Sequence, residues 1–308
     1  MRKGIIFLVL ILFWFTEGNA QQDPQYTQYM YNMNVVNPAY AGFRGTLSLG
    51  LLNRSQWTGV EGGPRTFTFN ASTPINEKVG LGISIVSDEI GPAKEQNIYA
   101  DFSYTLEVSN TGRLAFGFKT GVTLLDVNLT DLKLPVTPPS GDDLFKENVN
   151  EIFLNFGTGI YYYTDNFYVG ASIPNILKSE HLDKNTAFSK AAEEVHYYLT
   201  SGYVLEMTRD LKFKPSIMLR GVTGTPISID VSANFLLNDK FELGASYRMD
   251  DAISLLFNIG ISSSFRIGYA YDFTTSDFSN SDTGGSHEVI LLYDIDLSRR
   301  SLTRPRFF

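Results

Sequence analysis

The chain has 308 residues, a formal net charge of −8 and no cysteine. The acidic balance argues against nucleic acid as a main partner. Without cysteine there can be no disulfide, thiol catalysis, cysteine zinc site or lipidated cysteine. The length allows one large or two ordinary domains.

Residues 1–20 have the pattern of a secretory signal peptide. Arg2 and Lys3 give the positive start, and an apolar run follows from Ile5 to Phe15. Gly18, Asn19 and Ala20 supply small residues for cleavage. A transmembrane anchor is the alternative, but a span needs about 20 apolar residues. Since no other apolar run approaches that length, a membrane location of the mature chain would require a barrel.

Residues 21–43 form a segment rich in Tyr, Gln and Asn. The candidate binding residues here are Tyr26, Tyr29, Tyr31, Asn37, Pro38 and Tyr40. Such a segment needs a surface on which to lie, because tyrosine rings are amphipathic and suit interfaces. We expect it to enter from the periplasmic side and to plug the barrel mouth or shape a docking surface. The alternative is a local role in seating the first strand.

From residue 44 to residue 296 the chain repeats alternating runs of about ten residues. In the longest of these runs, Leu114, Phe116 and Phe118 fall on one face, and Gly117 and Lys119 on the other. Side chains alternate between faces in a strand, so each run predicts one. The predicted strands are 44–53, 64–73, 78–88, 95–107, 112–126, 151–163, 166–174, 195–207, 211–220, 226–236, 240–249, 252–261, 264–273 and 286–296.

The breaks between these strands indicate which kind of all-β fold they form. Every long break is odd-numbered and every even-numbered break is short. Outer-membrane barrels have short periplasmic turns and longer outer loops. We therefore predict an all-β protein, a transmembrane antiparallel β-barrel of about 14 strands, in the outer membrane with both termini periplasmic. The alternative is a secreted adhesin built from several β-sandwiches.

The sequence predicts no catalytic, metal or cofactor site. His181, His196 and His287 are scattered without metal-ligand spacing, and no Ser/His/Asp set can be identified. The inward-facing charges have mixed sign, whereas a selective pore shows rings of one sign. They are Asp101, Lys119, Lys212, Lys214, Arg220, Asp230, Glu242, Arg248, Arg266 and Asp272.

The sequence also resembles a known family. The resemblance rests on the motifs Asn37-Pro38-Ala39-Tyr40-Ala41-Gly42 and Arg54-Ser55-Gln56-Trp57, and on the closing strands from Phe265 onward. These resemble the PorP/SprF family of the type IX secretion system and gliding machinery of Bacteroidota. The resemblance implies a barrel of fourteen strands that works with outer-membrane lipids, periplasmic ring components and a secreted surface adhesin or other cargo. An outer-membrane channel or small-solute transporter is the alternative function.

Two regions outside the strands are expected to bind partners. By the parity of the breaks, loops 127–150 and 175–194 face the exterior, and with Arg54 and Trp57 we expect them to contact the adhesin or a translocon partner. The tail 297–308 contains Arg299, Arg300, Arg304 and Arg306 and no acid after Ser298. It either lies on anionic lipid headgroups, carries an insertion signal in Phe307 and Phe308, or tethers the barrel to the periplasmic ring.

Overall fold

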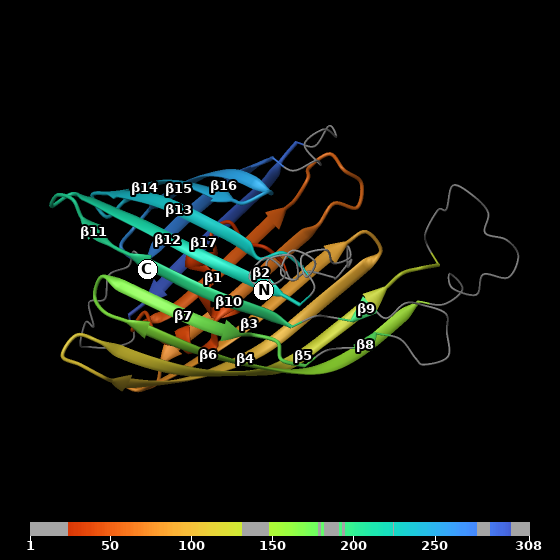
Figure 1. Ribbon diagram of the computed structural model, residues 1–308, viewed down its shortest axis with the longest axis horizontal. Helices are drawn as coiled ribbons and strands as arrows, with labels where there is room; N and C mark the ends of the chain where they lie inside the picture. The colour runs from red at the N-terminus through yellow and green to blue at the C-terminus, as the bar shows by residue number, and fades with distance from the viewer. Residues whose placement is uncertain are drawn as a thin grey trace, which may run out of the picture.

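The alternating runs form a closed antiparallel barrel in a computed structural model of the chain (Figure 1). The structure describes residues 24–130, 148–177, 180–181, 191–192, 195–223, 225–275 and 284–296. The expected signal peptide, the basic tail with its four arginines, and the central parts of loops 127–150 and 175–194 lie outside the described residues.

Fourteen strands form the wall, in chain order from β1 to β17. They are β1 (Leu47–Ser55), β2 (Arg65–Pro74), β3 (Val79–Ile90), β4 (Ala93–Glu107), β5 (Arg113–Val127), β6 (Val149–Tyr163), β7 (Phe167–Ile173), β10 (His196–Tyr203), β12 (Leu211–Val222), β13 (Ser228–Leu237), β14 (Phe241–Arg248), β15 (Ala252–Gly260), β16 (Phe265–Thr274) and β17 (Ser286–Ile295). Consecutive strands pair, and the β1–β17 pairing completes the ring. The short β11 (Leu205–Glu206) extends the β10 position along β12, and β8 (Glu180–His181) pairs only with β9 (Ala191–Ala192) among the described residues.

The strand prediction is confirmed, with ends displaced by four residues at most. Strand β10 ends at Tyr203 and not at residue 207, and β1 begins at Leu47 and not at residue 44. Gly42 and Gly45 have φ values of 72° and 74°, in the left-handed region that favours glycine. The chain therefore turns twice before it can extend, and Arg44 lies in this turn, where it forms an ion pair with Asp294.

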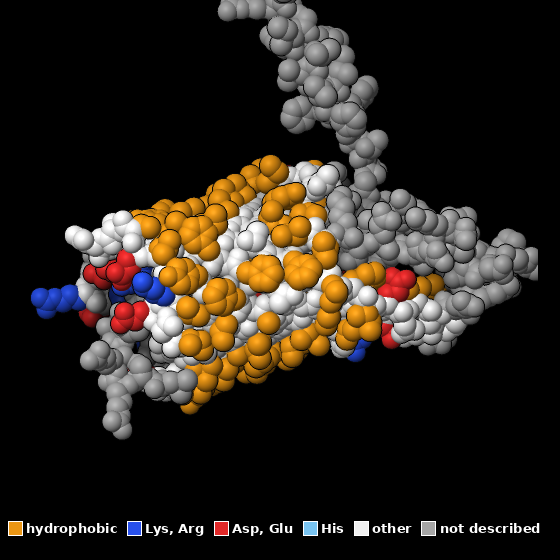
Figure 2. Space-filling model, turned by 90° about the horizontal axis from the view of Figure 1, so that it is seen from below, with side chains coloured by type: hydrophobic (Ala, Val, Ile, Leu, Met, Phe, Trp, Pro, Cys, Tyr) orange, Lys and Arg blue, Asp and Glu red, His pale blue; other side chains and the backbone are white. Residues whose placement is uncertain are grey.

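The two faces of the wall differ in polarity, as the alternation predicted. On β5 the outward Phe116 and Phe118 are 43% and 49% exposed, whereas the inward Ala115 and Lys119 are buried. Figure 2 shows hydrophobic side chains over the outside of the barrel, with charged side chains gathered at its ends. An apolar outer band on a closed barrel is suited to lipid, because every strand finds its hydrogen-bond partners in the wall.

The connections divide into two rims. The strand ends that flank the longest connections, 56–64, 128–148, 174–195 and 275–285, all lie at one end of the barrel, which we call the long-loop rim, to the right in Figure 1. The other end, the short-turn rim, has connections such as 75–78 and 164–166. Strand β1 starts at the short-turn rim, and β17 ends there.

The described helices are short and lie before the first strand. They are η1 (Tyr29–Tyr31), α2 (Met33–Val36) and η2 (Pro38–Tyr40). None of the helices in the described part of the chain has the length and apolarity to cross a membrane. Their side chains are buried, which places them inside the barrel and not on its surface.

The outward face provides a direct test of the barrel in lipid. Leu255 on β15 is 55% exposed, so Leu255→Arg would place a charge in the apolar band. We expect a loss of about 2–4 kcal/mol in the free energy of unfolding in lipid vesicles, as for an arginine near the bilayer midplane. Asp165→Arg, in the exposed 164–166 turn, is the control, and it should change the free energy of unfolding by under about 0.5 kcal/mol. Equal losses from the two changes would contradict a lipid-facing band.

Candidate functional site

The lumen of the barrel is filled by residues 24–43, which we call the lumen segment. Tyr29 is 1% exposed and Tyr40 5%, and the core of the protein lies between this segment and the inner wall. Tyr40 packs edge-to-face against Tyr161, with ring centroids 5.5 Å apart. Phe43 packs in the same way against Tyr163 at 4.6 Å. Edge-to-face aromatic pairs add to the stabilisation that burial provides.

The lumen segment runs from the long-loop rim to the short-turn rim. Pro24 and Gln25 lie with Trp57 at the long-loop rim, whereas the Ala41 carbonyl accepts a hydrogen bond from Ser103 Oγ, at 2.6 Å, near the short-turn rim. The described segment thus extends through the lumen from the long-loop rim and joins β1 at the short-turn rim, and its entry from the periplasmic side stays a prediction. The topology fixes where β1 begins, but it does not fix where the preceding twenty or so residues lie.

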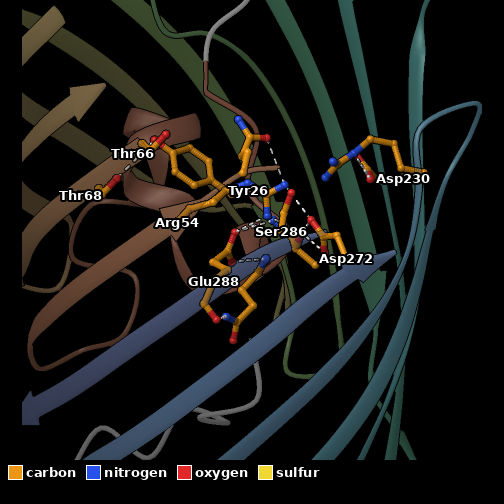
Figure 3. A network of polar contacts seen from close by, with 12 residues as sticks. Tyr26, Arg54, Thr66, Thr68, Asp230, Asp272, Ser286 and Glu288 are labelled. Atoms are coloured by element: carbon orange, nitrogen blue, oxygen red, sulfur yellow. Dashed lines mark hydrogen bonds and ion pairs between the residues drawn. The ribbon is translucent and has the colours of Figure 1, made fainter. Parts of the chain in front are cut away.

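The start of the lumen segment is held by an ionic cluster around Arg54 (Figure 3). Arg54 Nη2 lies 2.6 Å from Asp272 Oδ2, and Arg54 Nη1 lies 3.2 Å from Glu288 Oε2. Arg54 and Asp272 are 2% exposed and Glu288 is fully buried, so the cluster is little screened by solvent. A guanidinium shared between carboxylates satisfies charges that would otherwise be costly to bury.

The same carboxylates bind the backbone of the lumen segment. Glu288 accepts hydrogen bonds from the amides of Thr27 and Gln28, at 2.9 and 2.8 Å. Thr27 Oγ1 donates to Asp272 at 2.8 Å and accepts from Arg54 Nη1 at 3.0 Å. Charge-assisted hydrogen bonds are about twice as strong as neutral ones. Cleaving or displacing this end of the segment would leave Glu288 with two fewer donors inside the barrel.

A second buried charge holds the middle of the segment. Lys119 Nζ donates to the carbonyl oxygens of Asn34 and Val35, each at 3.2 Å, and forms an ion pair with Asp101 at 3.2 Å. These carbonyls belong to the short helix α2, whose last carbonyl groups have no partner within the helix. The ammonium group therefore satisfies backbone acceptors that the segment cannot satisfy itself.

A third polar contact involves Tyr31, whose hydroxyl donates to Glu242. Lys214 Nζ lies 3.4 Å from that hydroxyl, and Arg266 pairs with Glu242 at 3.2 Å. Tyr31 lies outside the membrane-spanning strands, as do Tyr29 and Tyr40. Burial raises the pKa of Tyr29 to about 12 and also raises those of Tyr31 and Tyr40, so all three phenols keep their protons at neutral pH.

Glycines in the wall let the lumen segment approach closely. A Cβ on Gly117 would overlap the backbone of Ala39, and one on Gly159 would overlap the side chain of Asn37. Asn37 donates from Nδ2 to the Ile160 carbonyl at 3.1 Å and accepts from the Ala39 amide at 3.0 Å. Pro38 begins η2 beside this contact. Glycine in a strand is a typical sign of close backbone approach.

The residues predicted to bind partners are thus divided between two environments. Tyr26, Tyr29, Tyr31, Asn37, Pro38, Tyr40 and Arg54 come together in the lumen, where they contact the barrel's own wall and are buried. Trp57 lies at the long-loop rim, where it and Arg54 line the same open cavity. Partners would therefore reach the four tyrosines, Asn37 and Pro38 only if the segment left the lumen.

An open cavity of about 770 Å³, which we call the vestibule, lies above the lumen segment at the long-loop rim. Its walls include Trp57, Met249 and Ile90, and its charged side chains are Arg54, Asp88, Arg220, Arg248, Asp250, Asp251 and Asp272. Arg248 is paired with Asp230 at 2.7 Å and with Asp251 at 3.1 Å. The described residues contain no cluster of three or more side chains suited to a metal ion.

Sequence reasoning missed Glu288, the residue that holds the start of the segment. A signal was present, since the alternation in the last predicted strand places Glu288 on the inward face. Its pairing with Arg54 depends on the closure of β1 onto β17, which brings residues 234 positions apart into contact. The mixed inward charges were predicted, but their role as anchors for the lumen segment was not.

Comparison with known proteins identifies the family. Residues 18–293 match the family described as type IX secretion system membrane protein PorP/SprF. No curated protein matches the chain. The solved structures it is similar to include the TodX monoaromatic hydrocarbon channel deltaS2 mutant, with a TM-score of 0.51, 12% identity and coverage of 87% of this chain and 94% of that one. The CymD monoaromatic hydrocarbon channel has a TM-score of 0.51 and 12% identity, with coverage of 86% of this chain and 93% of that one.

A third solved structure, the outer membrane protein Omp33 of Acinetobacter baumannii, gives a TM-score of 0.48 at 9% identity, with coverage of 82% of this chain and all of that one. At these identities the structural likeness concerns the barrel fold alone. The family match is different, because it extends over the lumen segment and all fourteen strands up to Tyr293. The chain belongs to the PorP/SprF family of type IX secretion system membrane proteins.

Proposed function

We propose that this barrel serves type IX secretion as a closed docking platform in the outer membrane. It binds periplasmic ring components at the short-turn rim and a secreted adhesin or other cargo protein at the long-loop rim. The observation that carries the proposal is the filled lumen, together with family membership. When the interior of a barrel is occupied by its own chain, the rims and loops are the surfaces that remain available to bind partners.

The filled lumen argues against the alternative of an open channel. The inward charges that would line a water path are engaged in the described residues with one another and with the lumen segment, as in the Arg54, Lys119 and Glu242 contacts. One observation favours a small-solute transporter as a second candidate, namely the vestibule of about 770 Å³ at one mouth. A solute that enters there would meet Pro24 and Gln25 and could pass only if the segment moved.

The assignment of partners to rims rests on the usual orientation of outer-membrane barrels. Short turns face the periplasm and longer loops face the exterior. Because β17 ends at the short-turn rim, the tail 297–308 would begin in the periplasm beside the ring components. The loops that contain Trp57 and Asp250 would face the exterior, where a secreted protein arrives.

The plug can be tested through the wall glycines. Gly117→Val should push Ala39 away from β5, and we expect single-channel conductance in a planar bilayer to rise from near zero to a measurable level. Gly221→Val is the matched control, since a Cβ there meets no atom within 4 Å. Heat-modifiable migration on gels checks that each variant is folded. A folded Gly117→Val barrel that conducts no more than the control, with the same result for deletion of residues 21–40, would rule out the plug.

Docking to the ring can be tested through the tail. Changing Arg299, Arg300, Arg304 and Arg306 to Ser, with Phe307 and Phe308 kept, should leave insertion intact but reduce co-purification of periplasmic ring components. The four Arg→Lys changes form the control: they keep the charge but lose the planar guanidinium that pairs with carboxylates. For the unchanged protein, added salt should weaken the interaction, because exposed charges are screened. Undiminished co-purification of the Ser variant would show that the tail has no docking role.

A further inference from the structure

The vestibule has the properties of a closed-ended receptor pocket. Its volume of about 770 Å³ lies within the range of roughly 300–1,000 Å³ typical of ligand sites. It is open at the long-loop rim, and Pro24 and Gln25 lie in its wall where the lumen segment begins. A chain that enters from the long-loop side therefore stops here and does not pass into the lumen.

We propose that the vestibule binds a positively charged, extended segment of a partner protein, through carboxylates and the indole of Trp57. This inference rests on the proposed docking function and gives it a site. It does not depend on the tail or on the periplasmic ring.

The charge of the vestibule favours a cation. Asp88, Asp250, Asp251 and Asp272 line it against three arginines, Arg54, Arg220 and Arg248. Two further carboxylates lie directly behind these arginines, Glu288 on Arg54 at 3.2 Å and Asp230 on Arg248 at 2.7 Å. Six carboxylates thus surround three guanidinium groups, which leaves the walls negative and attracts positive charge.

The arginines are already occupied, whereas one carboxylate is available. Arg54 and Arg248 each contact two carboxylates, so an incoming anion would have to displace them. Asp250, by contrast, is exposed and forms no ion pair among the residues that the structure describes. It lies in the turn between β14 and β15, at the wall of the vestibule. A lysine or arginine side chain could therefore pair with Asp250 without displacing another cation.

Trp57 supplies the apolar half of the site. Its amide donates to Ser286 Oγ at 3.3 Å, and the next residue, Thr58, donates from its amide to the Gly285 carbonyl at 2.9 Å. These contacts fix the loop against the start of β17 with the tryptophan at the vestibule wall. Tryptophan is the best aromatic partner for an ammonium or guanidinium group.

The fluorescence of Trp57 also reports binding in the vestibule. The chain has two tryptophans, and the other, Trp14, lies in the expected signal peptide. With Trp14→Phe, emission from the purified full chain in nanodiscs reports the vestibule alone, whether or not residues 1–20 are removed. Titration with acetyl-tetralysine-amide should give a saturable change in emission, whereas acetyl-tetraglutamate-amide should give none.

Asp250→Asn tests the carboxylate. Asp250 has a φ of 58°, and Asn tolerates this left-handed conformation as well as Asp does, so the turn should be preserved. We expect tetralysine affinity to fall about three- to fivefold, the size of an exposed ion pair. Asp210→Asn, an exposed acid in the turn before β12 at the opposite rim, should leave affinity unchanged.

Three results would overturn the proposal. The first is no emission change with tetralysine in a folded barrel. The second is equal or tighter binding of tetraglutamate, which would assign the pocket to an anion. The third is equal affinity for spermidine, which would assign it to a small polyamine and not to a peptide. Because purified protein is used, these outcomes are separable from failure of the docking function, which is read from co-purification of ring components.

Discussion

The constraint on which this structure depends is the need to satisfy a peptide backbone inside a barrel. The helices of the lumen segment are only three or four residues long, so their turns pair only part of its amides and carbonyls. An unpaired buried backbone group costs as much as a lost hydrogen bond. The wall therefore supplies the partners: Glu288 accepts from two amides at one end, Lys119 donates to two carbonyls in the middle, and Ser103 donates to Ala41 at the other end. Part of the inward charge, namely Glu288 and Lys119, is thus placed where this backbone needs partners.

Close packing inside the barrel depends on the same alternation that makes its outside apolar. Inward positions are occupied by small or polar residues, and in four places an asparagine lies directly opposite a glycine on the next strand, one of them being Asn155 opposite Gly121. The other three pairs are Asn70 with Gly50, Asn234 with Gly244 and Asn258 with Gly268; in each of these three, a Cβ on the glycine would overlap the asparagine side chain. The amide thus covers the glycine backbone. Where no asparagine covers the glycine, as at Gly117, the lumen segment takes that space.

The strands and their faces could be predicted because both depend on the local sequence. Period-2 alternation fixes which residues face lipid, and the lengths of the breaks fix which rim carries the loops. The route of the lumen segment could not be read in this way. Its anchors, such as Thr27 with Glu288, join residues 261 positions apart, and they exist only after the barrel has closed. The tyrosines correctly indicated a segment that needs a surface, but the same pattern would suit an external partner, and the partner observed is the inner wall.

The filled lumen also explains why the vestibule differs from the rest of the interior. Below it, the described carboxylates and cations are shared among wall and segment, as where Glu242 contacts Tyr31, Asn234 and Arg266, and water has little space to screen or reorganise them. At the long-loop mouth the segment has not yet filled the cross-section, so the last layer of inward charges faces open volume. A partner that enters from this side meets fixed charges already held in position by ion pairs, which lowers the ordering cost of binding. The interaction that closes the lumen, Arg54 with Asp272 and Glu288, therefore also shapes the surface that a partner would contact.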